Sequence, residues 1–304
     1  MIVPAPSRWR VLLLATRPHT LPLSLSPVLV GSVVGWAETG LLRLDITLAA
    51  AVSTACMQIG ANLQNDAADA LNGTDQADRL GPVRVTQQGW ISPARMFLAA
   101  RLCFALAVIT GIWLVLIGGW PLVLVGLLAV LAAWAYSGGP APISRGPLGE
   151  LVVLVFFGFI AVAGVAWLYS GQVSAAALLG GLVIGLPATA VLTINNLRDH
   201  DTDRRAGRRT LAILLGPRRA MMLVDGLRLA TLPALLALAS LGLPWTGALL
   251  GLAMLPMALG LARALRRAEG GGDYNRQLKQ TTLFQWLLSL LLGLGIVIGY
   301  GLTR

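Results

Sequence analysis

Long apolar runs alternate with short polar segments along the whole chain, and this alternation predicts a bundle of membrane-spanning helices. Several runs reach or exceed the roughly 20 residues that a helix needs to cross a bilayer. The pattern therefore predicts an all-α, polytopic membrane protein of about nine spans. We expect them at residues 17–37, 44–66, 94–117, 120–137, 148–169, 173–197, 217–242, 244–264 and 281–301.

Composition supports the same class of protein. Hydrophobic residues make up 56% of the chain and charged residues only 12%, and the mean hydropathy is +0.76. The two cysteines, Cys56 and Cys103, lie inside apolar runs without a surrounding motif. We interpret them as packing residues, because neither a disulfide framework nor a redox centre is indicated.

The basic residues predict the orientation in the membrane. With a cytoplasmic amino terminus, 21 of the 23 Lys and Arg residues lie on the cytoplasmic side, and only Arg43 and Arg304 lie outside. This bias is the term that sets topology. We expect a multi-pass protein of the inner or plasma membrane whose active site faces the cytoplasm. Insertion and an anionic ligand account for the net charge of +10, so nucleic acid is not an expected partner.

Two polar stretches, one in each half of the chain, repeat one pattern. They read NLQNDAADALNGTDQADRLGPVR from Asn62 and NNLRDHDTDRRAGRRTL from Asn195, and together they hold seven of the 13 acidic residues. Each contains an Asn followed four residues later by an Asp, and the two copies are 130 residues apart. The repeat predicts a single membrane domain, 1–304, with related halves at about 17–137 and 148–264 and a final span at 281–301.

Helical spacing places the polar side chains of each stretch on one face. In the first stretch, positions i, i+3, i+4 and i+7 are Asn62, Asn65, Asp66 and Asp69. In the second, positions i, i+4 and i+8 are Asn195, Asp199 and Asp203. Carboxylates crowded on one face repel each other unless cations compensate, and Asp and Asn oxygens suit Mg²⁺. Zinc is not expected, because neither stretch has a Cys or a second His at ligand spacing.

Arginines accompany both acidic clusters. Arg79 and Arg84 follow the first, Arg198 lies inside the second, and four more follow it, Arg204, Arg205, Arg208 and Arg209. The planar guanidinium group matches phosphate oxygens, so carboxylates and arginines together predict a site for a metal ion and a diphosphate. The alternative is that these arginines only extend into lipid headgroups. No Walker loop or dinucleotide glycine motif indicates a nucleotide.

The two motifs resemble those of the UbiA superfamily of intramembrane aromatic prenyltransferases. The fuller strings resemble its 1,4-dihydroxy-2-naphthoate polyprenyltransferase branch, which acts in menaquinone biosynthesis. The resemblance covers nearly the whole chain, through RPHTLPLSLSPVLVG, NDAADALNGTDQADRLGPVR, AYSGGPAPISRGPLGELVVLVFFG and INNLRDHDTDRRAGRRTLAILLG. Two positions depart from the pattern of many relatives. Gly73 replaces a third Asp, with Asp75 two residues later, and Ala67 replaces an aromatic residue.

The resemblance implies an Mg²⁺-dependent transfer of a polyprenyl group from an allylic polyprenyl diphosphate to 1,4-dihydroxy-2-naphthoate, with loss of CO₂ and diphosphate, giving demethylmenaquinone. The implied catalytic carboxylates are Asp66, Asp69, Asp199 and Asp203. Two Mg²⁺ ions would be held by these four carboxylates together with Asn65, Asp75 and Asn195. The isoprenoid tail of the substrate would lie in the lipid bilayer.

Further residues are assigned to the two substrates. The diphosphate-binding set is Arg79, Arg84, Arg145, Arg198, Arg208 and Tyr136, and the acceptor-binding set is Arg17, Asn62 and Glu150. Alternatives remain open for three of them. Tyr136 also suits an interfacial aromatic belt, Arg145 an insertion charge, and Glu150 a charge that favours a helix amino terminus.

Two other functions are compatible with parts of the pattern. Prenylation of another aromatic acceptor, such as 4-hydroxybenzoate, homogentisate or a porphyrin-type ring, would use the same metal motifs. A secondary transporter would also have two related halves, but transporters place their ionisable residues near the bilayer midplane. In this chain we expect every acid at or near a span end, which favours the enzyme.

Overall fold

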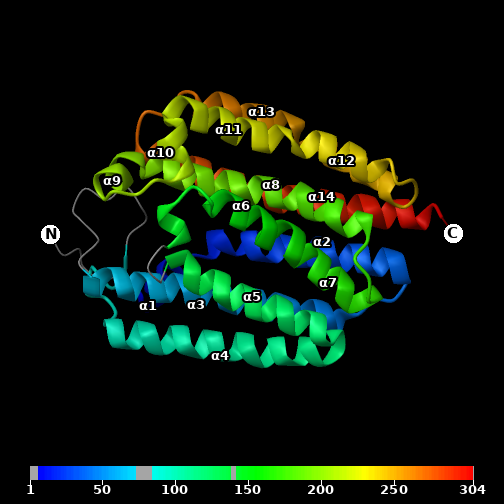
Figure 1. Cartoon of the computed structure of the whole chain (residues 1–304), viewed down its shortest axis with the longest axis horizontal. Coiled ribbons are helices and arrows are strands. Elements are labelled where there is room, and N and C mark those ends of the chain that lie inside the picture. Colours follow the sequence, from blue (N-terminus) through cyan, green and yellow to red (C-terminus); the bar gives the residue numbers. More distant parts are fainter. Residues whose placement is uncertain (1–5, 73–83, 138–141, 304) are drawn as a thin grey trace.

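The computed structural model describes residues 6–72, 84–137 and 142–303 and shows a bundle whose helices follow one long axis (Figure 1). From the amino terminus the elements are α1 (Arg8–Thr16), η1 (Pro18–Thr20), α2 (Leu21–Thr39), α3 (Leu44–Asn72), α4 (Pro93–Gly118), α5 (Trp120–Ser137) and η2 (Ile143–Arg145). They are followed by α6 (Gly149–Val153), the π-helical η3 (Leu154–Ile160), α7 (Ala161–Ser170), α8 (Ala175–Arg198), α9 (His200–Arg205), α10 (Leu211–Leu215), α11 (Pro217–Leu229), α12 (Thr231–Ala239), the 3₁₀-helical η4 (Trp245–Met254), α13 (Leu255–Leu265) and α14 (Gly271–Gly301).

The all-α membrane class predicted from the sequence is confirmed. Within the described residues, eight helical segments are long and apolar enough to cross a membrane. The predicted span at 120–137 corresponds to α5, whose Trp120–Ala129 part is a shorter apolar helix. Segment boundaries agree with the predicted ones within three residues, except at the starts of the first and last spans and at the inner end of α3.

The first and last spans begin earlier than predicted. Helix α1 begins at Arg8. The helical conformation is interrupted at Arg17, whose left-handed backbone (φ 51°, ψ 61°) caps the carboxyl end of α1. Val11 and Ala15 of α1 are buried against α3, which explains why this short polar-flanked helix is stable. The final helix begins at Gly271 rather than at the predicted residue 281. Its first turns carry polar side chains, so a hydropathy pattern does not identify them as part of a span.

Helix α8 forms the centre of the bundle and is the most enclosed of the described spans, with 78% of its apolar window buried. The main core cluster surrounds it with residues of α2, α7, α12, α13 and α14. Glycines permit the closest approach on one side. A Cβ on Gly158 of η3 would lie 2.7 Å from the carbonyl oxygen of Gly181, so η3 contacts α8 backbone to backbone. This central position fixes where the carboxyl end of α8 lies.

A second backbone contact joins η4 to α14. A Cβ on Gly247 would overlap the carbonyl oxygen of Gly295, and a Cβ on Gly295 would overlap that of Gly247. Small residues allow such close contacts between membrane helices, where dispersion and packing drive association. Because both contacting groups are main chain, neither can move aside by changing a rotamer.

Replacing Gly247 by Ala is expected to destabilise the bundle by about 1–3 kcal/mol, the range for overpacking a tight interface. The thermal unfolding midpoint of the detergent-solubilised protein measures this. The matched control is Gly260→Ala on α13, where an added Cβ meets nothing within 4 Å. Equal midpoints for the two variants would contradict the tight η4–α14 contact.

Candidate active site

The first acidic motif lies at the carboxyl end of α3, and its carboxylate Asp66 is almost completely buried. The Asp66 side chain accepts the backbone N–H of Val85 at one oxygen and that of Thr86 at the other, both at 3.1 Å. It therefore fastens the chain that follows residues 73–83 back onto α3. Carboxylate oxygens have further lone pairs, so this arrangement is compatible with a second partner.

The other residues predicted in this motif have different positions. Asn65 is exposed, whereas Arg84 is buried directly before Val85. Asp69 belongs to α3 and Tyr136 to α5, but their side chains lie outside the description. Asp75 and Arg79 lie outside the described residues altogether.

Asn62 lies one helical turn before Asp66 and holds the break between α1 and α2. Its side-chain amide donates to the carbonyl oxygen of Thr16 at 3.2 Å and to the hydroxyl of Thr20 at 3.1 Å. These two residues flank Arg17, whose left-handed backbone is uncommon for a residue with a side chain. Two residues of the predicted acceptor set, Arg17 and Asn62, are thus brought together.

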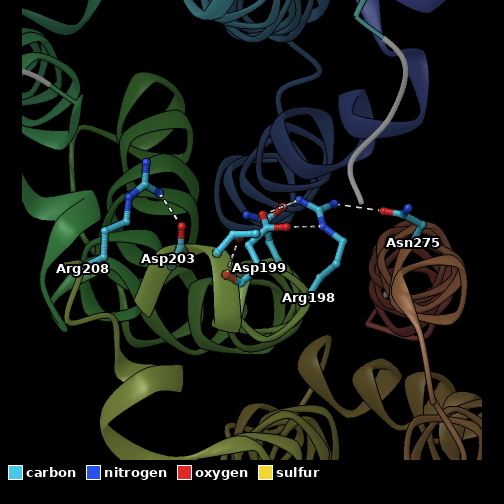
Figure 2. Close-up of polar contacts among 7 residues, drawn as sticks. Arg198, Asp199, Asp203, Arg208 and Asn275 are labelled. Atoms are coloured by element: carbon cyan, nitrogen blue, oxygen red, sulfur yellow. Dashed lines mark hydrogen bonds and ion pairs between the residues drawn. The ribbon is translucent and has the colours of Figure 1, made fainter. Parts of the chain in front are cut away.

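The second motif is organised around the guanidinium group of Arg198 (Figure 2). Its Nε and Nη2 donate to the two carboxylate oxygens of Asp199 at 2.8 and 2.6 Å, which is a bidentate ion pair. The same Nη2 also donates to Asn195 Oδ1 at 2.9 Å, and Nη1 donates to Asn275 Oδ1 at 2.9 Å. Arg198 therefore links two other predicted site residues, Asn195 and Asp199, to Asn275 of α14.

Asp203 lies one turn further on, in α9, and forms a separate ion pair. Arg208 Nη1 is 3.1 Å from Asp203 Oδ1, and the backbone N–H of Arg208 donates to the carbonyl oxygen of Asp203 at 3.0 Å. Burial raises the pKa of Asp203 above its usual value, and the negative charge of Asp199 adds to this, while Arg208 opposes it. The residue between them in the motif, Asp201, points away, with its side chain 92% exposed.

The loop before α6 is attached to the second motif. The backbone N–H of Arg209 donates to the carbonyl oxygen of Arg145 at 2.7 Å, while the Arg145 side chain is exposed. Just after this loop, Glu150 is buried and accepts the side-chain amide of Asn196 at 3.0 Å. Arg145 and Glu150, predicted for different substrates, thus contact the segment after α9 and the end of α8, respectively.

Helix α14 connects the two motif regions. Asn275 bonds Arg198 of the second motif, and α14 also packs against η1, which Asn62 of the first motif holds through Thr20. Both motif-bearing ends lie at the same end of the bundle (Figure 1), as the sequence pattern predicts.

The donor set of the second motif suits a magnesium ion. Asp199, Asp203 and Asn195 offer hard oxygen atoms, and Asp199 keeps 27% of its side chain exposed. Within the described side chains, no three Asp, Glu, His or Cys residues form a metal-binding group. A divalent ion would therefore need donors from beyond this set, and diphosphate oxygens or the first motif can provide them.

The sequence did not indicate Asn275 as a site residue, because the last span was predicted to begin at residue 281. A polar cluster inside the membrane was missed too. Asp225 lies within the Pro217–Ala239 span and so departs from the expectation that every acid is near a span end. The fully buried Arg228 beside it donates to Gln277 Oε1 at 2.8 Å and to the hydroxyl of Thr281. The positions of the acidic residues along the spans consequently give no argument against a transporter.

Comparison with known proteins supplies a stronger argument. The chain is 36% identical over 277 residues to the 1,4-dihydroxy-2-naphthoate octaprenyltransferase of Mycobacterium tuberculosis, covering 90% of this chain and 93% of that one. It is 37% identical over 216 residues to the Escherichia coli protein of the same name, covering 69% and 70%.

A solved structure shares the fold. It is a UbiA homolog from Archaeoglobus fulgidus bound to GPP and Mg²⁺, with a TM-score of 0.63 and 16% identity, and it matches 95% of this chain and 99% of its own. The model of the UbiA prenyltransferase family matches residues 24–288. This chain therefore belongs to the UbiA prenyltransferase family.

Proposed function

We propose that this protein transfers a polyprenyl group from an allylic polyprenyl diphosphate to 1,4-dihydroxy-2-naphthoate, with release of diphosphate and CO₂. The product is the prenylated naphthalenediol, the reduced form of demethylmenaquinone. Membership of a prenyltransferase family supports the transfer, and the names of both curated relatives support the naphthoate. The observation that carries the proposal is the location of the two oxygen-rich motifs at the same end of the bundle (Figure 1).

The second motif would hold one side of the diphosphate. Asn195, Asp199 and Asp203 are the proposed metal residues on this side, and Asn65, Asp66, Asp69 and Asp75 those of the first motif. When bound, two Mg²⁺ ions would neutralise the diphosphate and stabilise the charge that develops as its carbon–oxygen bond ionises.

Arginines would complete the diphosphate site. Arg198 and Arg208 each neutralise a motif carboxylate, at 2.6 and 3.1 Å, and their guanidinium groups are therefore already at the cluster that a diphosphate would enter. The exposed side chain of Arg145 starts from a loop bonded to the same segment. Arg84, and with it Arg79 and Tyr136, would act from the other side.

The acceptor would bind below the diphosphate, toward the membrane interior. Arg17 offers a cation for the ring carboxylate, and Asn62 positions Arg17 by holding both sides of the helix break. Glu150 lies beside the second motif through its contact with Asn196. The apolar tail of the first substrate would extend into the bilayer.

We place this end of the bundle on the cytoplasmic side of the membrane. The arginines of the second motif, of the loop before α6 and of α1 all lie at this end, while Arg43 lies at the opposite end of α3 (Figure 1). A strong excess of Lys and Arg is typical of the cytoplasmic side.

The first experiment is a transfer assay in membranes with radiolabelled polyprenyl diphosphate and one acceptor at a time. We expect labelled lipid product with 1,4-dihydroxy-2-naphthoate and release of its carboxyl carbon as CO₂. Transfer to 4-hydroxybenzoate but not to the naphthoate would show that the acceptor assignment is wrong while prenyl transfer is right.

Substitution of Asp203 by Asn should lower kcat by about 10²–10³-fold, as expected when a group that stabilises transition-state charge is lost. Asp201→Asn is the matched control, because this acid belongs to the same helix but has a 92% exposed side chain. Initial rates at saturating substrates measure the effect. Equal activity of the two variants would contradict a catalytic role for the buried carboxylate of Asp203.

Chelation should abolish transfer, and added Mg²⁺ should restore it. The unfolding midpoint should change little, because Arg198 and Arg208 neutralise Asp199 and Asp203 without a metal. Transfer at the full rate after exhaustive chelation would exclude a metal-dependent mechanism. A large fall in the midpoint would instead indicate a structural metal.

A further inference from the structure

Glu150 is a buried carboxylate with only one of its two oxygens engaged. Its side chain is 5% exposed, and Oε1 accepts the amide of Asn196 at 3.0 Å. The other oxygen, Oε2, is buried and has no hydrogen-bond partner among the residues that the structure describes. A buried, unsatisfied carboxylate oxygen is costly, since the desolvation of a charged group is recovered only through partners. A buried carboxylate oxygen of this kind is typical of a site that takes part in binding or catalysis.

No neighbouring charge explains the burial of Glu150. Helix α6 packs against α8 and η3, and η3 carries no charged residue. The one cation on α8 is Arg198, whose guanidinium group is occupied by Asn195, Asp199 and Asn275. Glu150 therefore has no ion-pair partner within the described residues, and a purely structural ion pair is not the reason for its presence.

The position of Glu150 relates it to the reaction. Its partner Asn196 precedes Asp199 by three residues on α8, which is about 4.5 Å along a helix axis toward the membrane interior. Glu150 thus contacts α8 within one helical turn of Asp199, beside the proposed diphosphate-binding groups, where the carbon end of an allylic diphosphate would meet its acceptor. An anionic diphosphate would be repelled by this carboxylate, whereas a hydroxyl group would be attracted as a hydrogen-bond donor.

We infer that Glu150 Oε2 accepts the proton of the acceptor's ring hydroxyl, while Asn196 holds Oε1 in place. This role rests on the proposed function, and it makes Glu150 a catalytic residue rather than only a contact of the acceptor. Asn196 is then a positioning residue, since it acts through Glu150.

The electrons and protons balance without an oxidant. As the hydroxyl proton moves to Glu150, the O–H electron pair moves toward the ring, and the adjacent ring carbon, which bears the carboxylate, forms the new bond to the allylic carbon. Diphosphate leaves with the electron pair of the carbon–oxygen bond. The ring carboxylate then leaves as CO₂, its bonding pair restores the aromatic ring, and Glu150 returns the proton to the ring oxygen.

The test compares Glu150→Gln with wild type, because glutamine keeps the shape and an oxygen for Asn196 but cannot take up the proton. We expect transfer to fall by about 10²–10⁴-fold, the usual contribution of general base catalysis. The affinity for an unreactive thio-analogue of the prenyl diphosphate should stay within about twofold, since that site is intact. Glu38→Gln, an exposed glutamate at the opposite end of α2, should change neither quantity.

A series of acceptors with increasingly acidic ring hydroxyls separates proton transfer from a structural role. An acceptor whose hydroxyl is already ionised needs no base, so the ratio of wild-type to Glu150→Gln rates should fall toward one along the series. A constant ratio would show that Glu150 is structural, and wild-type activity of the variant would exclude any role. A parallel loss of diphosphate-analogue affinity would assign the residue to the diphosphate site instead.

The outcomes also separate this role from the proposed function. If wild type prenylates 4-hydroxybenzoate rather than the naphthoate, the same series can be made from that acceptor, which also has a ring hydroxyl. The acceptor assignment would then be wrong and the role of Glu150 still decided. Absence of transfer to every aromatic hydroxy acid by the wild type would overturn both.

Discussion

The fork of hydrogen bonds from Arg198 is the interaction on which the site depends. One guanidinium group neutralises Asp199, orients Asn195 and reaches Asn275 on α14. Because its side chain is only 6% exposed, water screens these interactions weakly, and such bidentate pairs are geometrically specific. The same contact joins α8, the most enclosed helix, to the last helix of the chain. The shape of the second motif is therefore coupled to the packing of the whole bundle.

The bilayer explains why the chemistry is concentrated at one end of the bundle. A diphosphate and its metal ions cannot enter hydrocarbon, whereas an isoprenoid tail gains by staying there. A helix end at the membrane surface satisfies both, since it places oxygen donors at the rim and an apolar surface immediately below. Asp225 and Arg228 obey the same constraint differently. They lie inside a span, where Arg228 donates hydrogen bonds to Gln277 and Thr281 of α14 and lies 3.9 Å from Asp225.

Periodicity and hydropathy were sufficient to predict the fold class and most span boundaries, because lipid requires long apolar helices. They were insufficient where local polarity and tertiary packing compete. The helix break at Arg17 depends on Asn62, which lies 45 residues away, and no local pattern encodes that contact. Helix α14 begins ten residues before the predicted start of the last span. The polar residues Asn275 and Gln277 masked this part of the helix in the hydropathy pattern, although hydrogen bonds to Arg198 and Arg228 hold them in the bundle.

The candidate site was predictable to a similar extent. Residue type and spacing identified the second motif, whose Asn195, Asp199 and Asp203 do lie together with arginines. The part played by Asp66 was not predictable, because Val85 and Thr86 contribute backbone N–H groups, which carry no signal in the sequence. The single engaged oxygen of Glu150 is likewise visible only in three dimensions.

The two motifs are thus alike in sequence and unlike in structure. In the second, arginine side chains neutralise the carboxylates, and Arg208, whose side chain is 43% exposed, can rotate away from Asp203 when a cation arrives. In the first, Asp66 is bonded to two main-chain groups, so it cannot be released without moving the segment that begins at Arg84. A metal ion can therefore replace the cationic partner of Asp203 more easily than the main-chain partners of Asp66. The second motif is the side of the proposed site that can adjust its charge to the substrate. The first motif fixes the position of the segment that begins at Arg84.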